Sequence, residues 1–194
     1  MPARCGTGPG FEAAVRGPGD HVIRNLPRDW RIFERMQPGD EYPAAHEIAK
    51  AMFREARDAR RKAGEHVRKG SKAWHDLRQS IVPPYRVDRF PNKWWKLDSE
   101  RPSRTLMAHL GKDSYSHIHY DSEQARTISV REAARLQSFP DGFVFNGSMN
   151  SAFTQIGNAV PPLLAYQVGL TLKDIIQNAM PSTAGTSDVL AAAE

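Results

Sequence analysis

The stretch 126–141, RTISVREAARLQSFPD, contains the clearest helix signal in the chain. Ser129 and Glu132 have the S-x-x-E spacing of a capping box. In this motif the hydroxyl accepts a bond from a free backbone N–H, and the carboxylate accepts one from the cap residue's own N–H. Pro140 cannot continue a helix. We therefore predict a short helix that begins after Ser129 and ends before Pro140.

A second helix is expected downstream. Pro161 and Pro162 suit a first helical turn, where a missing N–H is tolerated. The apolar residues that recur at helical spacing after them are Leu164, Val168, Leu172 and Ile175. From residue 179 the chain is dominated by Pro, Ser, Thr, Ala and Gly, which is typical of a disordered tail over 179–194.

Two more helices and a basic run are expected upstream. Asn25 is placed to cap a short amphipathic helix that stops at Pro38-Gly39, and Pro43 begins another helical pattern. This second pattern becomes basic at Arg54, Arg57, Arg60, Arg61, Lys62, Arg68, Lys69 and Lys72, against only Glu55, Asp58 and Glu65. We expect an exposed basic helix or mobile arm that contacts DNA; the alternative is a solvated helix face with no partner.

The remaining segments predict loops and short strands. Gly and Pro are dense in residues 1–20, which indicates a flexible lead-in. Residues 81–103 are rich in Pro and aromatics, so we expect irregular chain around an aromatic cluster, with Trp94 and Trp95 in a small core. Short strands are expected at 21–24, 106–109 and 117–120, the last two as a hairpin.

Composition narrows the classes of protein. The 194 residues suit one domain, or one domain plus part of another, and the net charge of +5 with a pI of about 9.5 favours nucleic acid as a partner. A single cysteine excludes an internal disulfide and favours a reducing compartment. No apolar run approaches the roughly 20 residues of a membrane span, and no signal peptide is evident, so a cytoplasmic location is expected.

Two segments near the end resemble a known family. Residues 126–141 resemble motif IX of the cytosine-C5 DNA methyltransferases, and 155–165, QIGNAVPPLLA, resemble motif X, in the right order and spacing. Residues 102–106 resemble the Thr-Leu element near the end of that family's target-recognition domain. The stretch 21–39 looks like the linker into that domain, so the resemblance covers roughly residues 20–178.

The resemblance implies roles for five residues. Asn158 and Val160 match positions that border S-adenosylmethionine, the methyl donor of the family. Thr105 matches a threonine that touches a phosphate beside the flipped base, and Ser103 and Arg104 flank it as further DNA-binding candidates. Each could instead be structural: Asn158 in a turn, Thr105 as an ordinary strand residue.

Other polar residues are expected to be structural. Arg131 and Arg135 lie in the motif IX match, which organises the recognition domain in this family, so we expect them to be buried or paired. His117 and His119 are read as alternating strand histidines, with no metal expected, because no carboxylate or thiol accompanies them in the sequence.

The family's catalytic residues have no match in these 194 residues. The enzymes attack cytosine C6 with the thiolate of a Pro-Cys pair, after the base has left the stack. Cys5 follows Arg4 in the glycine-rich lead-in, and neither the cofactor loop nor the Glu-Asn-Val segment is found. We therefore assign no catalytic residue, and expect S-adenosylmethionine to bind only together with a separate chain that carries those motifs.

The sequence predicts a mixed α/β protein. Residues 1–20 would be the lead-in, 21–147 a small irregular target-recognition domain, 148–178 the segment that completes a Rossmann-like methyltransferase domain, and 179–194 the tail. The expected function is that of a fragment or subunit of a DNA (cytosine-5-)-methyltransferase, inactive alone, that binds double-stranded DNA. The alternatives are a DNA-binding module without catalysis and an inactive truncated remnant. Without its partner, the apolar face of the last helix would be exposed and the chain poorly soluble.

Overall fold

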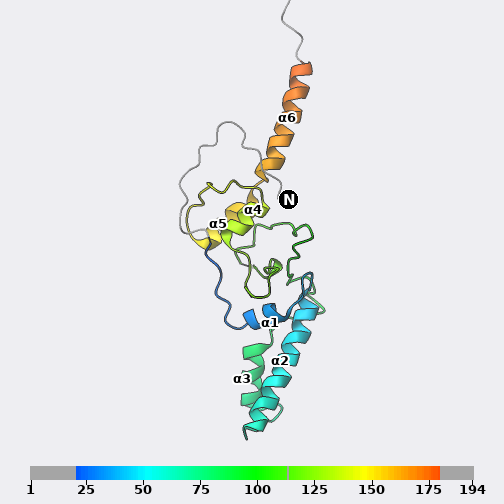
Figure 1. Ribbon diagram of the computed structural model, residues 1–194, viewed down its shortest axis with the longest axis vertical. Helices are drawn as coiled ribbons and strands as arrows, with labels where there is room; N and C mark the ends of the chain where they lie inside the picture. Colours follow the sequence, from blue (N-terminus) through cyan, green and yellow to red (C-terminus); the bar gives the residue numbers. More distant parts are fainter. Residues whose placement is uncertain (1–20, 113, 180–194) are drawn as a thin grey trace, which may run out of the picture.

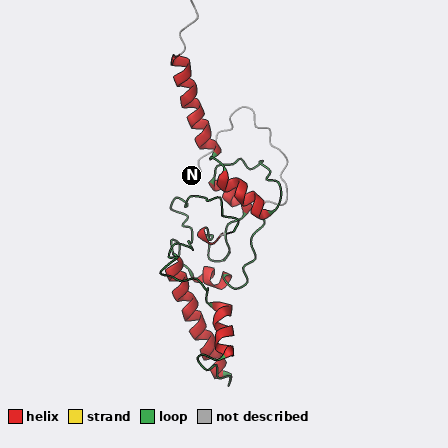
Figure 2. Cartoon of the chain, turned by 180° about the vertical axis from the view of Figure 1, so that it is seen from behind, coloured by secondary structure: helices red, strands yellow, loops and turns green. Residues whose placement is uncertain are grey.

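The computed structural model describes residues 21–112 and 114–179, which form an elongated molecule (Figure 1). Within these residues the elements are helices, loops and isolated β-bridges, with no strand (Figure 2). In chain order they are α1 (Trp30–Arg35), α2 (Tyr42–Lys62), α3 (Lys72–Ile81), the 3-10 turn η1 (Ser114–Ser116), α4 (Val130–Leu136), α5 (Met149–Asn158) and α6 (Pro162–Ala179). The predicted lead-in, and the predicted tail from residue 180 onward, lie outside the described residues.

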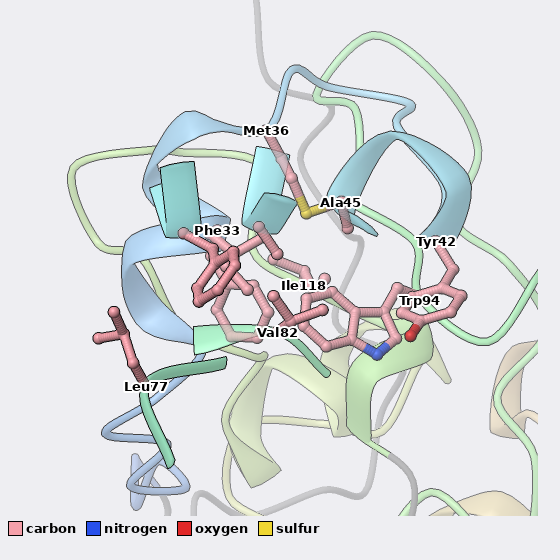
Figure 3. Packing of buried hydrophobic residues seen from close by; sticks show 11 residues of the cluster. Phe33, Met36, Tyr42, Ala45, Leu77, Val82, Trp94 and Ile118 are labelled. Atoms are coloured by element: carbon pink, nitrogen blue, oxygen red, sulfur yellow. The ribbon is translucent and has the colours of Figure 1, made fainter. Parts of the chain in front are cut away.

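The first core joins α1, α2 and α3 around Trp94 (Figure 3). Trp94 is fully buried, stacks on Tyr115 at 4.8 Å between ring centroids, and meets the edge of Phe33 at 5.4 Å. Such aromatic pairs add about 0.5–1.5 kcal/mol to the burial of their area. Tyr42 and Ala45 complete one side of this core from the first turns of α2. The aromatic cluster expected from the sequence is therefore present, with Trp94 at its centre.

A buried lysine ties α1 to the middle of the chain. Lys96 is 0% exposed, and its ammonium donates to the carbonyls of Phe33 and Met36 at 2.7 and 2.8 Å and to Ser122 Oγ at 2.6 Å. The two carbonyls belong to the end of α1, where cations are favoured by the helix dipole. Burial lowers the pKa of Lys96. Three hydrogen bonds thus replace the water that this charge loses.

The second core lies between α4 and α5. Ala133 and Ala134 of α4 pack with Phe153 and Ile156 of α5, and Leu110 is buried with them. The capping box expected from the sequence is formed in full at the start of α4, and the helix ends before Pro140 as predicted. This core positions the motif IX match against the first half of the motif X match.

The helix predictions hold in part. The helices expected after Pro43 and after Pro161 are α2 and α6. The first helix begins later than expected, because Asp29 and not Asn25 occupies the N-cap position. Helix α3 was not predicted; the Ser71 side chain caps it by accepting from Trp74 N, and it follows α2 as the second arm of a hairpin. Helix α5 was also not predicted, and Gly157-Asn158 is its last turn rather than a free turn.

The predicted strands do not form in the described residues. Residues 21–24 are irregular, and those at 106–109 enter successive turns, Leu110 N to Met107 O and Lys112 N to His109 O. Backbone groups used in turns cannot pair in a hairpin. At 117–120 only Ile118 pairs, with Lys96 in a parallel bridge and with Thr127 in an antiparallel one. The mixed α/β class is therefore not seen in this part of the chain.

Helix α6 projects away from the rest of the molecule (Figures 1 and 2). It has no buried residue and packs against no other described helix. Its large apolar side chains, together with Val160 before it, are between 38% and 63% exposed. The exposed apolar face predicted for this helix is thus observed. No helix among the described residues is long and apolar enough to cross a membrane.

Candidate functional site

The Thr-Leu element is held by its neighbours at Arg104. The guanidinium lies over the ring of Trp95, 4.5 Å from its centroid, and donates to Asn92 O at 3.0 Å. The Arg104 carbonyl accepts from Ser103 Oγ at 3.0 Å and from His117 Nε2 at 3.2 Å. Of the three candidate residues, Arg104 and Ser103 therefore have bonds within the protein and are half-buried.

Thr105 differs from its two neighbours. Its side chain is exposed and makes no hydrogen bond within the part of the chain that the structure describes. A free hydroxyl on a fixed backbone can donate to a phosphate oxygen without reading the base sequence. The Thr105 hydroxyl is therefore available to a ligand.

Gly157 brings the motif X match against this element. A Cβ added at Gly157 would lie 2.6 Å from the carbonyl carbon of Met107 and 2.8 Å from Cα of Ala108. Distances of this kind require glycine, because both neighbours are backbone atoms that cannot rotate away. The chain at Thr105 and the chain at Asn158 are consequently each within two residues of one direct backbone contact.

The end of the motif IX match holds the corner between α5 and α6. Gln137 Nε2 donates to Ile156 O at 3.2 Å and to Ala159 O at 3.0 Å. Ser138, which has a positive φ of 64°, accepts from Leu163 N at 3.1 Å. These bonds satisfy carbonyls at the end of α5 and a free N–H at the start of α6.

Asn158 and Val160 lie in the corner that these bonds stabilise. Both side chains are exposed, Val160 to 63%, and Asn158 makes no hydrogen bond to another described residue. An accessible amide beside an accessible apolar side chain can border a ligand with both polar and apolar groups. Asn158 and Val160, the candidate cofactor-binding residues, thus lie on one side of the contact between Gly157 and the Met107–Ala108 backbone, and Thr105 lies on the other.

The capping box of α4 contains a carboxyl with a strongly lowered pKa, Glu132. Burial raises the pKa of Glu132, but the Arg126 guanidinium, at 2.7 Å, and the Ser129 backbone N–H outweigh burial and lower the pKa to about 2. Glu132 therefore stays ionised over the physiological range. The ion pair is only partly accessible, with side-chain exposures of 15% for Arg126 and 25% for Glu132.

Arg131 and Arg135 of the motif IX match have structural partners. Arg131 is buried and donates to Phe143 O at 2.9 Å, while Arg135 forms an exposed pair with Asp141 at 2.7 Å. Both bind the loop that follows α4; the sequence predicted that they would be buried or paired, and Arg131 is buried and Arg135 is paired. A cavity of about 450 Å³ between this helix and the Thr-Leu element is lined in part by Ser103 and Tyr120. Sequence reasoning did not anticipate it, because its walls come from distant segments.

His117 and His119 contact different groups of the protein. His117 Nε2 donates to Arg104 O, and its Nδ1 lies 3.0 Å from Ser116 Oγ. Burial lowers the pKa of His117. His119 stacks on Tyr120 at 4.5 Å and accepts from Asp121 N at 3.2 Å. Nowhere in residues 21–112 or 114–179 do three His, Cys, Asp or Glu side chains come together as a metal site would require.

Comparison with known proteins identifies the family of the chain. The family model for C-5 cytosine-specific DNA methylase matches residues 27–174. A protein of Oceanobacillus iheyensis described as a type II methyltransferase is 49% identical over 157 residues, which cover 81% of this chain and 33% of that protein. A type II methyltransferase of Thalassovita gelatinovora is 39% identical over 119 residues, 61% of this chain and 27% of its own. A DNA (cytosine-5-)-methyltransferase of Aeropyrum pernix is 42% identical over 76 residues, 39% of this chain and 16% of its own.

The chain belongs to the C-5 cytosine-specific DNA methylase family. It spans a third or less of the length of the relatives named above.

Proposed function

We propose that this chain is the C-terminal part of a DNA (cytosine-5-)-methyltransferase, which binds double-stranded DNA and completes the cofactor pocket of a separate chain that carries the catalytic motifs. Residues 21–147 would form the target-recognition domain and 148–178 a segment of the Rossmann-like catalytic domain. The observation that carries the proposal is α6, an apolar helix with no buried residue that follows directly on the Asn158 corner. The family and the short match to its members agree with this reading.

The surface of α6 is suited to a protein partner. Leu164, Val168, Leu172 and Ile175 are each at least half exposed. Full burial of such a side chain contributes about 1.5–3 kcal/mol. Because each of the four is only about half exposed, docking could bury about half of this area, which gives on the order of 3–6 kcal/mol before the entropic cost of association, itself about 4–15 kcal/mol. A stable complex therefore needs further contacts, and the Asn158 corner lies next to this helix.

The cofactor candidates fit an accessory role. Asn158 and Val160 are accessible, and the Gln137 and Ser138 bonds hold the backbone around them. In the proposed complex they would border S-adenosylmethionine, while the partner chain would supply most of its site. S-adenosylmethionine, when bound, supplies the methyl group. This chain would hold one edge of the pocket and exclude water from it.

Thr105 would have a different task, on the DNA. Its hydroxyl would donate to a phosphate oxygen next to the target base, and the Arg104 contacts to Trp95 and Asn92 would keep its backbone in place. Ser103 and Arg104 are secondary candidates, because they already bond to protein groups. Since Thr105 and Asn158 flank one backbone contact, the DNA and cofactor edges would move as a unit.

Reconstitution tests the proposal. The matching partner is the part of the Oceanobacillus iheyensis relative that this chain does not match, expressed as a separate protein. Transfer of labelled methyl from S-adenosylmethionine to a DNA duplex is measured for each protein alone and for the mixture. We expect methyl transfer to cytosine from the mixture only, with a complex visible by size-exclusion chromatography.

The control is the same mixture with Leu164, Val168 and Leu172 replaced by Gln in this chain. It should neither associate nor methylate. A chain that binds a specific DNA sequence, stays monomeric and behaves identically with and without the partner would be a DNA-binding module without catalysis. A chain that neither binds DNA nor restores transfer would be an inactive remnant. Type II methyltransferases among the relatives favour a restriction–modification role for the reconstituted enzyme.

A further inference from the structure

The net positive charge of the chain is concentrated in one segment. Residues 54–72 contain eight Lys and Arg and three Asp and Glu, for a net charge of +5. The whole chain has 27 Lys and Arg and 22 Asp and Glu, which is also +5, so nineteen of each remain elsewhere. The protein outside this segment is therefore neutral, and an argument about polyanion binding has to start from the segment.

The segment is the tip of a helical hairpin. It runs from the last half of α2, through the turns at Gly64 and Gly70, to the start of α3. Phe53 and Trp74 meet edge to face at 5.4 Å, with Leu77 buried near them, and they join the two helices at the base of this tip. From Phe53 to Lys62, α2 extends about 13 Å further at about 1.5 Å per residue. The hairpin lies at the opposite end of the molecule from α6 (Figures 1 and 2).

The basic side chains of the tip are accessible. Seven of the eight are exposed, namely Arg54, Arg60, Arg61, Lys62, Arg68, Lys69 and Lys72. Of the acids, Glu55 is paired at 3.0 Å with Arg35, which lies outside the segment. The cations of the tip thus face solvent on a helical hairpin, which agrees with the exposed basic helix expected from the sequence.

Helix dipoles separate a folding role from a binding role. Arg60, Arg61 and Lys62 are in the last turn of α2, where cations stabilise the helix itself. The N-terminal end of α3 also has basic residues near it, namely Arg68, Lys69 and Lys72, and the first turn of this helix has no acid. Cations there oppose the positive end of the helix dipole. Three basic residues at an unfavourable place for folding point to an anionic partner.

We propose that the α2–α3 hairpin tip is a DNA-backbone arm, which contacts phosphates of the duplex outside the target site and sets affinity without setting sequence preference. The proposal rests on the proposed function, because it takes DNA as the partner. The length of the arm matches the spacing of phosphates: about 13 Å covers roughly four phosphates of one strand, which are about 3.4 Å apart along the axis. Contacts of this kind release counterions and make binding depend steeply on salt.

The test uses the full chain with Arg68, Lys69 and Lys72 replaced together by Gln. Binding to a duplex that extends past the recognition site is measured by fluorescence anisotropy between about 50 and 200 mM salt. If each cation contacts one phosphate, the slope of log Kobs against log salt falls in magnitude by about 2.7, and affinity near 0.1 M salt falls by roughly several hundred-fold. Thermal stability should stay the same or rise, because the substitutions remove unfavourable charges from the start of α3.

The matched control replaces Arg31, Arg86 and Arg89 by Gln, which removes the same charge from exposed positions outside the tip. It should lose far less affinity and slope than the tip variant. Equal losses in both variants would overturn the arm and leave only a general charge effect. An unchanged tip variant would also overturn it, while a wild-type chain that binds no duplex at any salt would refute the proposed function itself. Tight binding to duplex RNA but not to duplex DNA would assign the tip to another polyanion and overturn the proposal.

Discussion

Replacing Gly157 by Ala tests the backbone contact on which the whole site depends. Two effects of opposite sign compete. Alanine in place of glycine within a helix stabilises that helix by about 1 kcal/mol. However, the new Cβ would lie 2.6 Å from the carbonyl carbon of Met107 and 2.8 Å from Cα of Ala108. Overpacking of this kind costs typically about 1–3 kcal/mol, and here the neighbours are backbone atoms that move only if both segments separate.

The overlap should outweigh the helix propensity. Because the overlap is with backbone atoms, its cost should lie at the upper end of that range, about 2–3 kcal/mol, so we expect a net loss of about 1–2 kcal/mol of unfolding free energy, which in a chain of this size lowers Tm by roughly 2–8 °C. Urea unfolding followed by tryptophan fluorescence measures it, since Trp94 is buried in the core. The same variant should bind DNA more weakly, because the backbone at Thr105 must shift away from α5.

Gly169 is the matched control. It lies in α6 with nothing within 4 Å of an added Cβ. Its replacement by Ala keeps the propensity gain of up to about 1 kcal/mol without the overlap, so it should raise helicity and leave DNA binding unchanged. Suppose that Gly157→Ala is as stable as wild type and binds DNA equally well. Gly157 and the chain at Met107 and Ala108 are then not in direct backbone contact, and the proposed coupling between the DNA edge and the cofactor edge is refuted.

Four further predictions concern single features. The depressed pKa of Glu132 means that its contribution, on the order of 3 kcal/mol, is present above about pH 4.5 and is lost as pH falls toward about 2, so Glu132→Gln should flatten the acid limb of a Tm-against-pH curve. Thr105→Val should weaken DNA binding about tenfold for all sequences alike, whereas Thr171→Val on α6 should not change the dissociation constant. Lys96→Met should cost about 2–4 kcal/mol in urea unfolding, because two carbonyls at the end of α1 lose their buried donor; an unchanged midpoint would contradict the role given to that donor. Replacing Leu164 and Leu172 by Gln should leave the free energy of unfolding within about 0.5 kcal/mol of wild type and reduce self-association in sedimentation velocity, since both side chains are exposed.

Local signals were sufficient where one segment decides its own structure. The capping box of Ser129 and Glu132, and the prolines before α6, act over three or four residues, so both helices could be predicted. Helix α3 was hidden because its apolar residues are few and lie within a basic run, although Ser71 and Trp74 carry a capping signal. Helix α5 is not among the predicted helices, although Met149, Ala152, Phe153 and Ile156 have helical spacing behind Ser148 as a cap.

The site could be predicted only as separate pieces. The resemblance named Thr105 and Asn158 individually, but nothing local connects residues 105–108 with 157–160. Their proximity depends on the absence of one Cβ at Gly157, and on Gln137 bonding to two carbonyls about twenty residues away. The predicted strands failed for a related reason: the backbone at Met107 and His109 forms turns, and strand pairing would have required a partner segment that long-range packing does not provide.

The lack of tertiary support for α6 has a consequence for the order in which this protein assembles. A helix of 18 residues with no packed face is marginal in water, because propagation barely offsets the cost of its nucleus. Its amides should exchange with deuterium within the time in which α4 and α5 remain protected. Docking would then order a fluctuating segment rather than join two rigid bodies. The association should therefore show a large negative heat-capacity change, and variants that destabilise the helix should associate more slowly. The bond from Leu163 N to Ser138 Oγ holds the first turn of α6. It would therefore set how much of α6 is already ordered before the partner arrives.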